Sequence, residues 1–98
     1  MSYDVAIGDW SGNTTFNHRI VFERVVPRGL HGLHGLTGSQ ASKSLALGLI
    51  HNLPVIEEEL RFEMEGCAWG SYEAAVQFLR DLHLACQYSP RHKVRLYC

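Results

Sequence analysis

The feature that most constrains the fold is an apolar stripe that recurs at helical spacing between Ser71 and Pro90. Ser71 is a favourable N-cap, and Glu73 suits the positive end of the helix dipole. The pattern therefore predicts a helix that begins after Ser71, ends before Pro90 and buries one face against another layer. Its apolar face is formed by Ala75, Val76, Leu79, Leu82, Ala85 and Cys86.

Two segments at opposite ends of the chain alternate with the period of a β-strand. Tyr3, Val5 and Ile7 fall on one face of the first segment. The range 93–98 alternates in the same way, with Val94, Leu96 and Cys98 expected to point inward. We expect these two strands to pair in a small sheet.

The segment between the first strand and the first proline predicts a turn followed by a helix. Residues 8–13 combine glycine with Asp, Ser and Asn, which favour turns. The segment from Thr15 to Val26 predicts a helix, which ends there because Pro27 disfavours helical geometry at the residue before it. Three β-branched residues weaken this helical pattern.

The middle of the chain contains a glycine-rich loop, a second helix and one ambiguous segment. Residues 28–38 read RGLHGLHGLTG and show neither a helical nor a strand period. A helix is predicted from Thr37 or Ser39 to Asn52, ending before Pro54. Residues 55–65 fit a helix or a strand, so a third strand remains open.

Composition supports a single α+β domain spanning residues 1–98. The chain is 46% hydrophobic and carries a formal net charge of −1, which excludes a highly charged disordered protein and argues against strong nucleic-acid binding. The three cysteines, an odd number without CxxC spacing, predict a reducing, cytoplasmic location. Without a secretory signal or about 18 consecutive apolar residues, no membrane association is expected.

The glycine-rich loop is a candidate anion site, because it leads into a predicted helix N-terminus. Gly35 and Thr37 would offer backbone amides, helped by the helix dipole, to a phosphate group. Arg28 would supply charge. The spacing matches neither a P-loop nor a dinucleotide fingerprint, so a structural turn is the alternative.

His31 and His34 are three residues apart and could share one divalent ion, with His18, His51 or a cysteine completing the shell. Solvated or hydrogen-bonding histidines are the alternative. No nucleophile motif occurs, so we assign no catalytic residue and no cofactor, and expect a non-enzyme.

Recognition surfaces are suggested by aromatic and polar residues in predicted loops and on the terminal strand. Trp10 and Trp69 each lie beside glycines, outside the apolar stripes. Packing beneath the loops would equally explain both tryptophans. Arg95 belongs to a small basic patch near the C-terminus, which could meet an acidic partner or a phosphate. Asn13, Thr15 and Asn17 are candidates for reading polar groups of a ligand.

Several segments in order resemble a family of small uncharacterised proteins from bacteriophages and their hosts. These are the opening YDV, a spaced N-x-T-x-N cluster, a glycine loop ending in LTG, and a WGS turn before the last helix. The sequence departs from that pattern at His31 and His34, at Cys67-Ala68 before the tryptophan, and at the acidic residues 57–59. The resemblance implies a phage setting and no defined reaction.

The resulting expectation is a counter-defence protein that binds a host immune protein, such as a CRISPR effector, and occludes its working surface. A first alternative is a sponge that sequesters a small nucleotide signal, and a second is a metal-dependent enzyme. The chain could also form a homo-oligomer. Fold and setting alone do not decide among these functions.

Overall fold

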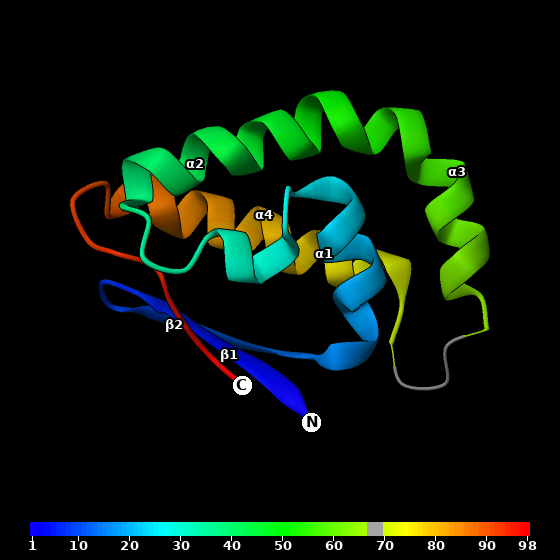
Figure 1. The fold of residues 1–98 in the computed structure, drawn as a ribbon, viewed down its shortest axis with the longest axis horizontal. Helices are drawn as coiled ribbons and strands as arrows, with labels where there is room; N and C mark the ends of the chain where they lie inside the picture. The colour runs from blue at the N-terminus through cyan, green and yellow to red at the C-terminus, as the bar shows by residue number, and fades with distance from the viewer. Residues whose placement is uncertain (67–69) are drawn as a thin grey trace.

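The computed structural model describes residues 1–66 and 70–98, which form a layer of helices on one face of a small sheet (Figure 1). The strands are β1 (Ser2–Ile7), β2 (Trp10–Thr15) and β3 (Arg95–Tyr97). The α-helices are α1 (Arg19–Val25), α2 (Gly38–Leu47), α3 (Leu53–Met64) and α4 (Tyr72–Tyr88). Three shorter helical turns are η1 (Phe16–His18), η2 (Gly29–Gly32) and η3 (Gly48–Asn52). The predicted α+β fold is confirmed.

The sheet is three-stranded and antiparallel, in the order β2-β1-β3, so the terminal strand pairs with the first as predicted. The strand that the sequence analysis did not predict is β2, which lies where the turn-forming residues 8–13 predicted a turn. Only Gly8 and Asp9 form that turn, with Gly8 at a φ of 57°. The remaining turn-forming residues, Ser11, Gly12 and Asn13, continue as an edge strand, because pairing with β1 overrides their local preference.

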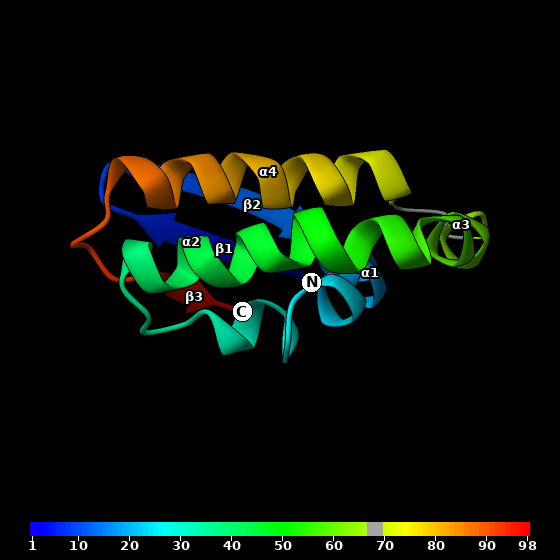
Figure 2. The same cartoon turned by 90° about the horizontal axis from the view of Figure 1, so that it is seen from above.

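Helices α2 and α4 lie side by side over the sheet, as the view from above shows (Figure 2). The face of β1 that carries Tyr3, Val5 and Ile7 is buried beneath this layer. The predicted apolar stripe of α4 is buried along its whole length. The core is therefore formed between one face of the sheet and one face of each helix, and no helix of the described part of the chain covers the opposite sheet face (Figure 1).

The helix predicted from Thr15 begins later, at Arg19. Residues up to Thr15 are held in β2, and a short 3-10 turn follows before α1 starts. The predicted end of the second helix at Asn52 is also wrong. Helix α2 continues through the π-helical turn η3 into α3. Pro54 lacks the amide that a regular helix would use, and the wider π-helical turn immediately before it interrupts the regular hydrogen-bond pattern. The ambiguous residues 55–65 are almost wholly in α3.

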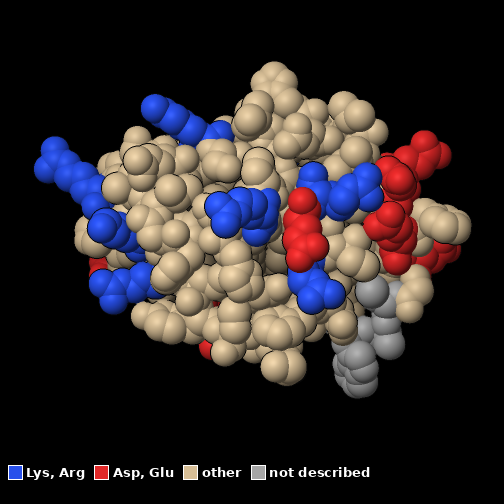
Figure 3. Space-filling view, in the orientation of Figure 1, with Lys and Arg blue, Asp and Glu red and all other residues tan. Residues whose placement is uncertain are grey.

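Ion pairs attach the acidic helix α3 to its neighbours. Arg24 of α1 contacts Glu59 at 2.9 Å and Glu63 at 3.3 Å, and Arg61 contacts Glu73 of α4 at 2.7 Å. These pairs are exposed to solvent, which screens them, so they orient the helices more than they stabilise the fold. Acidic side chains gather over α3 with some Lys and Arg side chains beside them, and further Lys and Arg side chains lie in the centre and project at the opposite end of the molecule (Figure 3). Within the described ranges, each helix is too short or too polar to span a bilayer.

Gly48 sits where η3 touches the end of α1. A Cβ at this position would lie 2.5 Å from the Val25 carbonyl oxygen and 3.0 Å from Val25 Cγ1. The same carbonyl accepts a 3.0 Å hydrogen bond from Asn52 Nδ2. We expect Gly48→Ala to lower the free energy of unfolding by about 1–3 kcal/mol, because the two helices must separate.

Urea unfolding followed by circular dichroism measures the effect of Gly48→Ala. Gly66→Ala is the matched control, because a Cβ there meets nothing within 4 Å. Equal stability of the Gly48→Ala variant and the wild type would show that η3 can shift away from Val25 at no cost.

Candidate functional site

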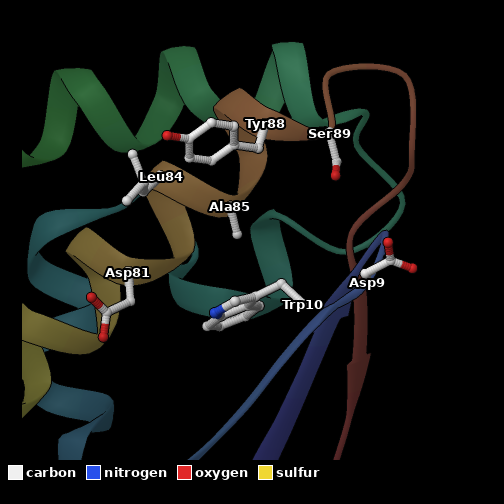
Figure 4. A pocket seen from close by; sticks show the side chains of 7 residues that line it. All are labelled: Asp9, Trp10, Asp81, Leu84, Ala85, Tyr88 and Ser89. Atoms are coloured by element: carbon white, nitrogen blue, oxygen red, sulfur yellow. The ribbon is translucent and has the colours of Figure 1, made fainter.

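A groove of about 480 Å³ lies between the hairpin end of β2 and the C-terminal half of α4 (Figure 4). The Trp10 ring forms the strand side of this groove, and Leu84 and Tyr88 form the helix side. Asp9 and Asp81 lie at opposite ends of the view in Figure 4. The complete lining is Asp9, Trp10, Asp81, Leu84, Ala85, Tyr88 and Ser89. We refer to this feature as the β2–α4 groove.

The position of Trp10 depends on the absence of a side chain at Gly12. Both residues face the helix layer, and a Cβ at Gly12 would lie 2.7 Å from the edge of the indole ring. The ring also packs against Phe78 of α4, with centroids 5.9 Å apart. Trp10 is thus partly buried and held in place, so its exposed edge forms a rigid wall of the β2–α4 groove.

Helix α4 presents apolar side chains to solvent at the β2–α4 groove. Leu84 is 52% exposed and Tyr88 is 80% exposed. The two residues are four apart on a helix and therefore share one face. Since the core does not cover them, they add an exposed apolar surface beside Trp10, and such clustered surfaces mark interaction sites.

The outer edge of β2 carries backbone groups that no other strand among the described residues pairs. Phe16 N donates to Met1 O, so these two residues form a hydrogen-bonded pair at the end of the β1–β2 ladder. Hydrogen-bonded and non-hydrogen-bonded residue pairs alternate along an antiparallel ladder from that point. By that alternation Tyr3, Val5 and Ile7 exchange hydrogen bonds with their β2 partners. The N–H and C=O groups of Ser11 and Asn13 therefore point away from β1, toward the open edge beside the β2–α4 groove.

The predicted polar ligands on β2 and after it have local structural partners. Asn13 Nδ2 donates to Asp4 Oδ1 at 2.7 Å and to Ser2 Oγ at 3.1 Å. Thr15 Oγ1 accepts from the Asn17 amide at 3.3 Å and caps η1. These contacts account for the side chains of Asn13 and Thr15 without a ligand.

The amides that the phosphate hypothesis requires are already hydrogen-bonded. At the start of α2, Gly38 N donates to His92 O at 2.7 Å, and Ser39 N donates to Pro90 O at 3.0 Å. Thr37 forms a capping box with Gln40. Gly35 N donates to Val94 O at 2.8 Å. The glycine loop in this conformation closes onto the segment before β3 and offers none of these four groups to an anion.

The two histidines of the glycine loop contact the C-terminal strand. His34 Nδ1 accepts from the Leu96 amide at 2.9 Å, which fixes that nitrogen as an acceptor. His31 Nε2 lies 3.8 Å from the Cys98 thiol. Within residues 1–66 and 70–98, no three His, Cys, Asp or Glu side chains are grouped so that they could hold a metal ion.

The remaining candidate residues lie apart from the β2–α4 groove or outside the residues that the structure describes. Arg95 lies on β3 and, with His92 and Lys93, lines a hollow of about 300 Å³ beside Gly8. Arg28 precedes η2 in a left-handed conformation, with φ at 65°. Trp69 and Cys67 lie outside the described residues. Of the predicted residues that the structure describes, only Trp10 lines the β2–α4 groove.

His18 is a buried hub that the sequence patterns did not single out as such. Its Nδ1 lies 2.7 Å from Thr14 Oγ1, and its Nε2 accepts from the Ser71 amide at 3.2 Å. Nε2 as acceptor leaves the proton on Nδ1, which donates to Thr14. Burial lowers the pKa of His18 below its ordinary value. The side chain therefore links β2 to the start of α4.

Some functional residues that the sequence analysis missed could have been found from the helical spacing, and others could not. Leu84 and Tyr88 lie outside the apolar stripe of the predicted helix at a spacing of four, so an exposed apolar pair was readable. The position of Asp81 in the groove and the hydrogen bond from the Ser71 amide to His18 both depend on contacts between distant parts of the chain, so no local pattern indicates them. The buried Cys86 thiol has its pKa raised to about 11 by burial, which makes it a poor nucleophile.

No protein-family model, no curated protein and no solved structure matches this chain.

Proposed function

We propose that the protein is a phage-type counter-defence protein that acts by stoichiometric binding. It would occlude the working surface of a host immune protein, such as a CRISPR effector. The β2–α4 groove carries this proposal. An aromatic wall held rigidly by Phe78 and two exposed apolar side chains resemble the anchors that dominate the energy of protein interfaces.

The charge distribution fits a binder that orients on its partner. Acidic side chains gather over α3, where Arg24 and Arg61 pair with some of them, and further Lys and Arg side chains project at the other end, although the formal net charge is only −1 (Figure 3). Complementary charges speed association and fix register more than they add affinity. The apolar groove would then supply the binding energy.

A titration of effector activity tests this function. A panel of purified CRISPR effectors is assayed for DNA cleavage at increasing concentrations of the protein. Occlusion predicts that inhibition of at least one effector saturates at a fixed molar ratio near one. Complete inhibition by a small fraction of an equivalent would indicate enzymatic inactivation instead, and failure to inhibit or bind any effector would count against this function.

Groove variants should weaken that inhibition in a position-specific way. We expect Tyr88→Ala to weaken binding to the inhibited effector by about 2 kcal/mol, since buried interface aromatics commonly cost this much. Phe62→Ala is the matched control, because Phe62 is 77% exposed and lies on α3, away from the groove. Isothermal titration calorimetry measures both variants. Equal affinities would place the interface elsewhere.

Sequestration of a nucleotide signal is the second candidate, and one observation favours it. His92, Lys93 and Arg95 line the hollow beside Gly8, which could accept a phosphate even though the glycine loop is closed. A thermal-shift screen against cyclic and linear nucleotides separates the two functions. A sponge gains stability from one nucleotide, whereas an occluding protein gains it only from its protein target.

A further inference from the structure

We propose that the occupant of the β2–α4 groove is an extended segment of a partner protein, which adds to the open edge of β2 as an antiparallel strand. This inference rests on the proposed binding function and specifies how binding occurs. The segment would carry one large apolar side chain, with a Lys or Arg two residues away on each side.

Backbone geometry supports strand addition. The outward N–H and C=O groups of Ser11 and Asn13 have the spacing with which an antiparallel partner exchanges hydrogen bonds. Ser11 and Asn13 are themselves exposed. Main-chain bonds would give affinity, and side chains at alternate positions would give specificity.

The lining of the groove determines which kind of side chain the added strand would place toward the helix layer. Cross-strand partners share a face of the sheet, so a residue opposite Gly12 points to the same side as Trp10. The space directly above Gly12 is filled by the Trp10 ring, because a Cβ there would lie 2.7 Å from it. The apolar side chain of the added strand would therefore contact the exposed part of that ring, with Leu84 and Tyr88 on the α4 side. The volume of about 480 Å³ admits a Leu, Met or aromatic side chain, since it falls in the range of ordinary small-ligand pockets.

Charge identifies the flanking residues. Asp9 and Asp81 both line the groove, one near each end, and its lining among residues 1–66 and 70–98 includes no Lys or Arg. A strand in which residues i, i+2 and i+4 are basic, apolar and basic would place its cations toward these carboxylates. A second copy of the chain fits less well as occupant, because its own β2 edge, Trp10–Thr15, contains no basic residue.

A peptide with the sequence Ser-Lys-Thr-Leu-Thr-Lys-Ser is the first probe. We expect NMR spectra of the isotope-labelled protein to show two effects when this peptide is added. The indole signal of Trp10 should shift, and hydrogen exchange at the amides of Ser11 and Asn13 should slow. A matched peptide with Glu in place of both Lys residues should bind at least 5-fold more weakly. Asp81→Lys, which leaves one carboxylate and one ammonium group in the groove, should abolish that preference. Equal binding of the two peptides would overturn the charge assignment.

N-methylation of the peptide backbone tests the strand itself. In one peptide the methyl group replaces a hydrogen that faces β2, and in a second it is moved by one residue to the solvent-facing side. Strand addition predicts at least a 10-fold loss for the first and little change for the second. Equal affinities, or unchanged exchange at Ser11 and Asn13, would overturn the proposal. Slow hydrogen exchange at the Ser11 and Asn13 amides in a homodimer without peptide would show that a second copy of the chain occupies the β2 edge. That result would also overturn the proposal.

The outcomes separate this inference from the function on which it rests. If the protein inhibits an effector but the Ser11 and Asn13 amides exchange freely in that complex, strand addition fails while occlusion stands. If the peptide binds as expected but no effector is inhibited, the strand site stands and the counter-defence function fails.

Discussion

Phe22→Ala should lower the free energy of unfolding by about 3–5 kcal/mol, the usual cost of removing a buried aromatic ring. Phe22 is 1% exposed and lies between the sheet and the helices. Its ring centroid is 6.2 Å from that of Tyr3 on β1, 6.1 Å from the His18 imidazole and 5.8 Å from Phe78 on α4. The cavity left by alanine would touch all three neighbours.

The effect should extend from the core to the β2–α4 groove. Phe78 contacts both Phe22 and Trp10, so it connects the centre of the core to the wall of the groove. We therefore expect Phe22→Ala to broaden the indole signal of Trp10 in NMR spectra as well as to destabilise the fold. Urea unfolding measures the first effect, with Phe62→Ala, an exposed aromatic truncation, expected to change stability by less than about 0.5 kcal/mol. Similar losses in the two variants would contradict the assignment of Phe22 to the core.

Segments whose local pattern agrees with their tertiary surroundings were predictable from sequence. The α4 stripe and the alternation of Tyr3, Val5 and Ile7 each specify a buried face, and that face is buried in the fold. Residues 10–15 show the opposite case. Their composition favours turns, but a two-residue turn at Gly8-Asp9 aligns them with β1, and the ladder hydrogen bonds outweigh local preference.

The candidate site was predictable only in part, since it joins residues far apart in the chain. Trp10 was identifiable as an aromatic residue beside glycines, outside the periodic stripes. Its wall partners lie on α4, more than seventy residues later, and their approach depends on how that helix crosses the sheet. The glycine loop illustrates the reverse: its composition suggested free amides, whereas His92 and Pro90 carbonyls from a distant segment accept them.

His18→Leu should lower the free energy of unfolding by about 2–4 kcal/mol. Leucine has a similar apolar bulk but leaves the Thr14 hydroxyl and the Ser71 amide without their partner, and each buried unsatisfied group costs about 1–3 kcal/mol. The neighbouring Gly70 leaves little room for rearrangement, because a Cβ there would lie 2.8 Å from the His18 ring. Chemical unfolding at pH 7.5 measures the loss. A variant as stable as the wild type would show that water replaces both hydrogen bonds.

The same histidine should make stability depend on pH in a defined direction. Burial lowers the folded pKa of His18 below its ordinary value of 6.5, so the unfolded chain takes up a proton first as the pH falls. The stabilisation is therefore complete above pH 6.5, declines as the pH falls and is lost below the folded pKa. Protonation of Nε2 also removes the acceptor for the Ser71 amide, which would release the start of α4 from β2.

His18→Gln separates this titration from that of the other five histidines, because glutamine keeps an N–H donor and an oxygen acceptor but does not ionise near neutral pH. Unfolding free energies between pH 7.5 and 5 should fall more steeply for the wild type than for His18→Gln. Parallel curves would mean that the imidazole is solvated before it protonates. A steeper wild-type curve would establish His18 as the group through which acid loosens the junction of β2 and α4, and with it the support of the β2–α4 groove.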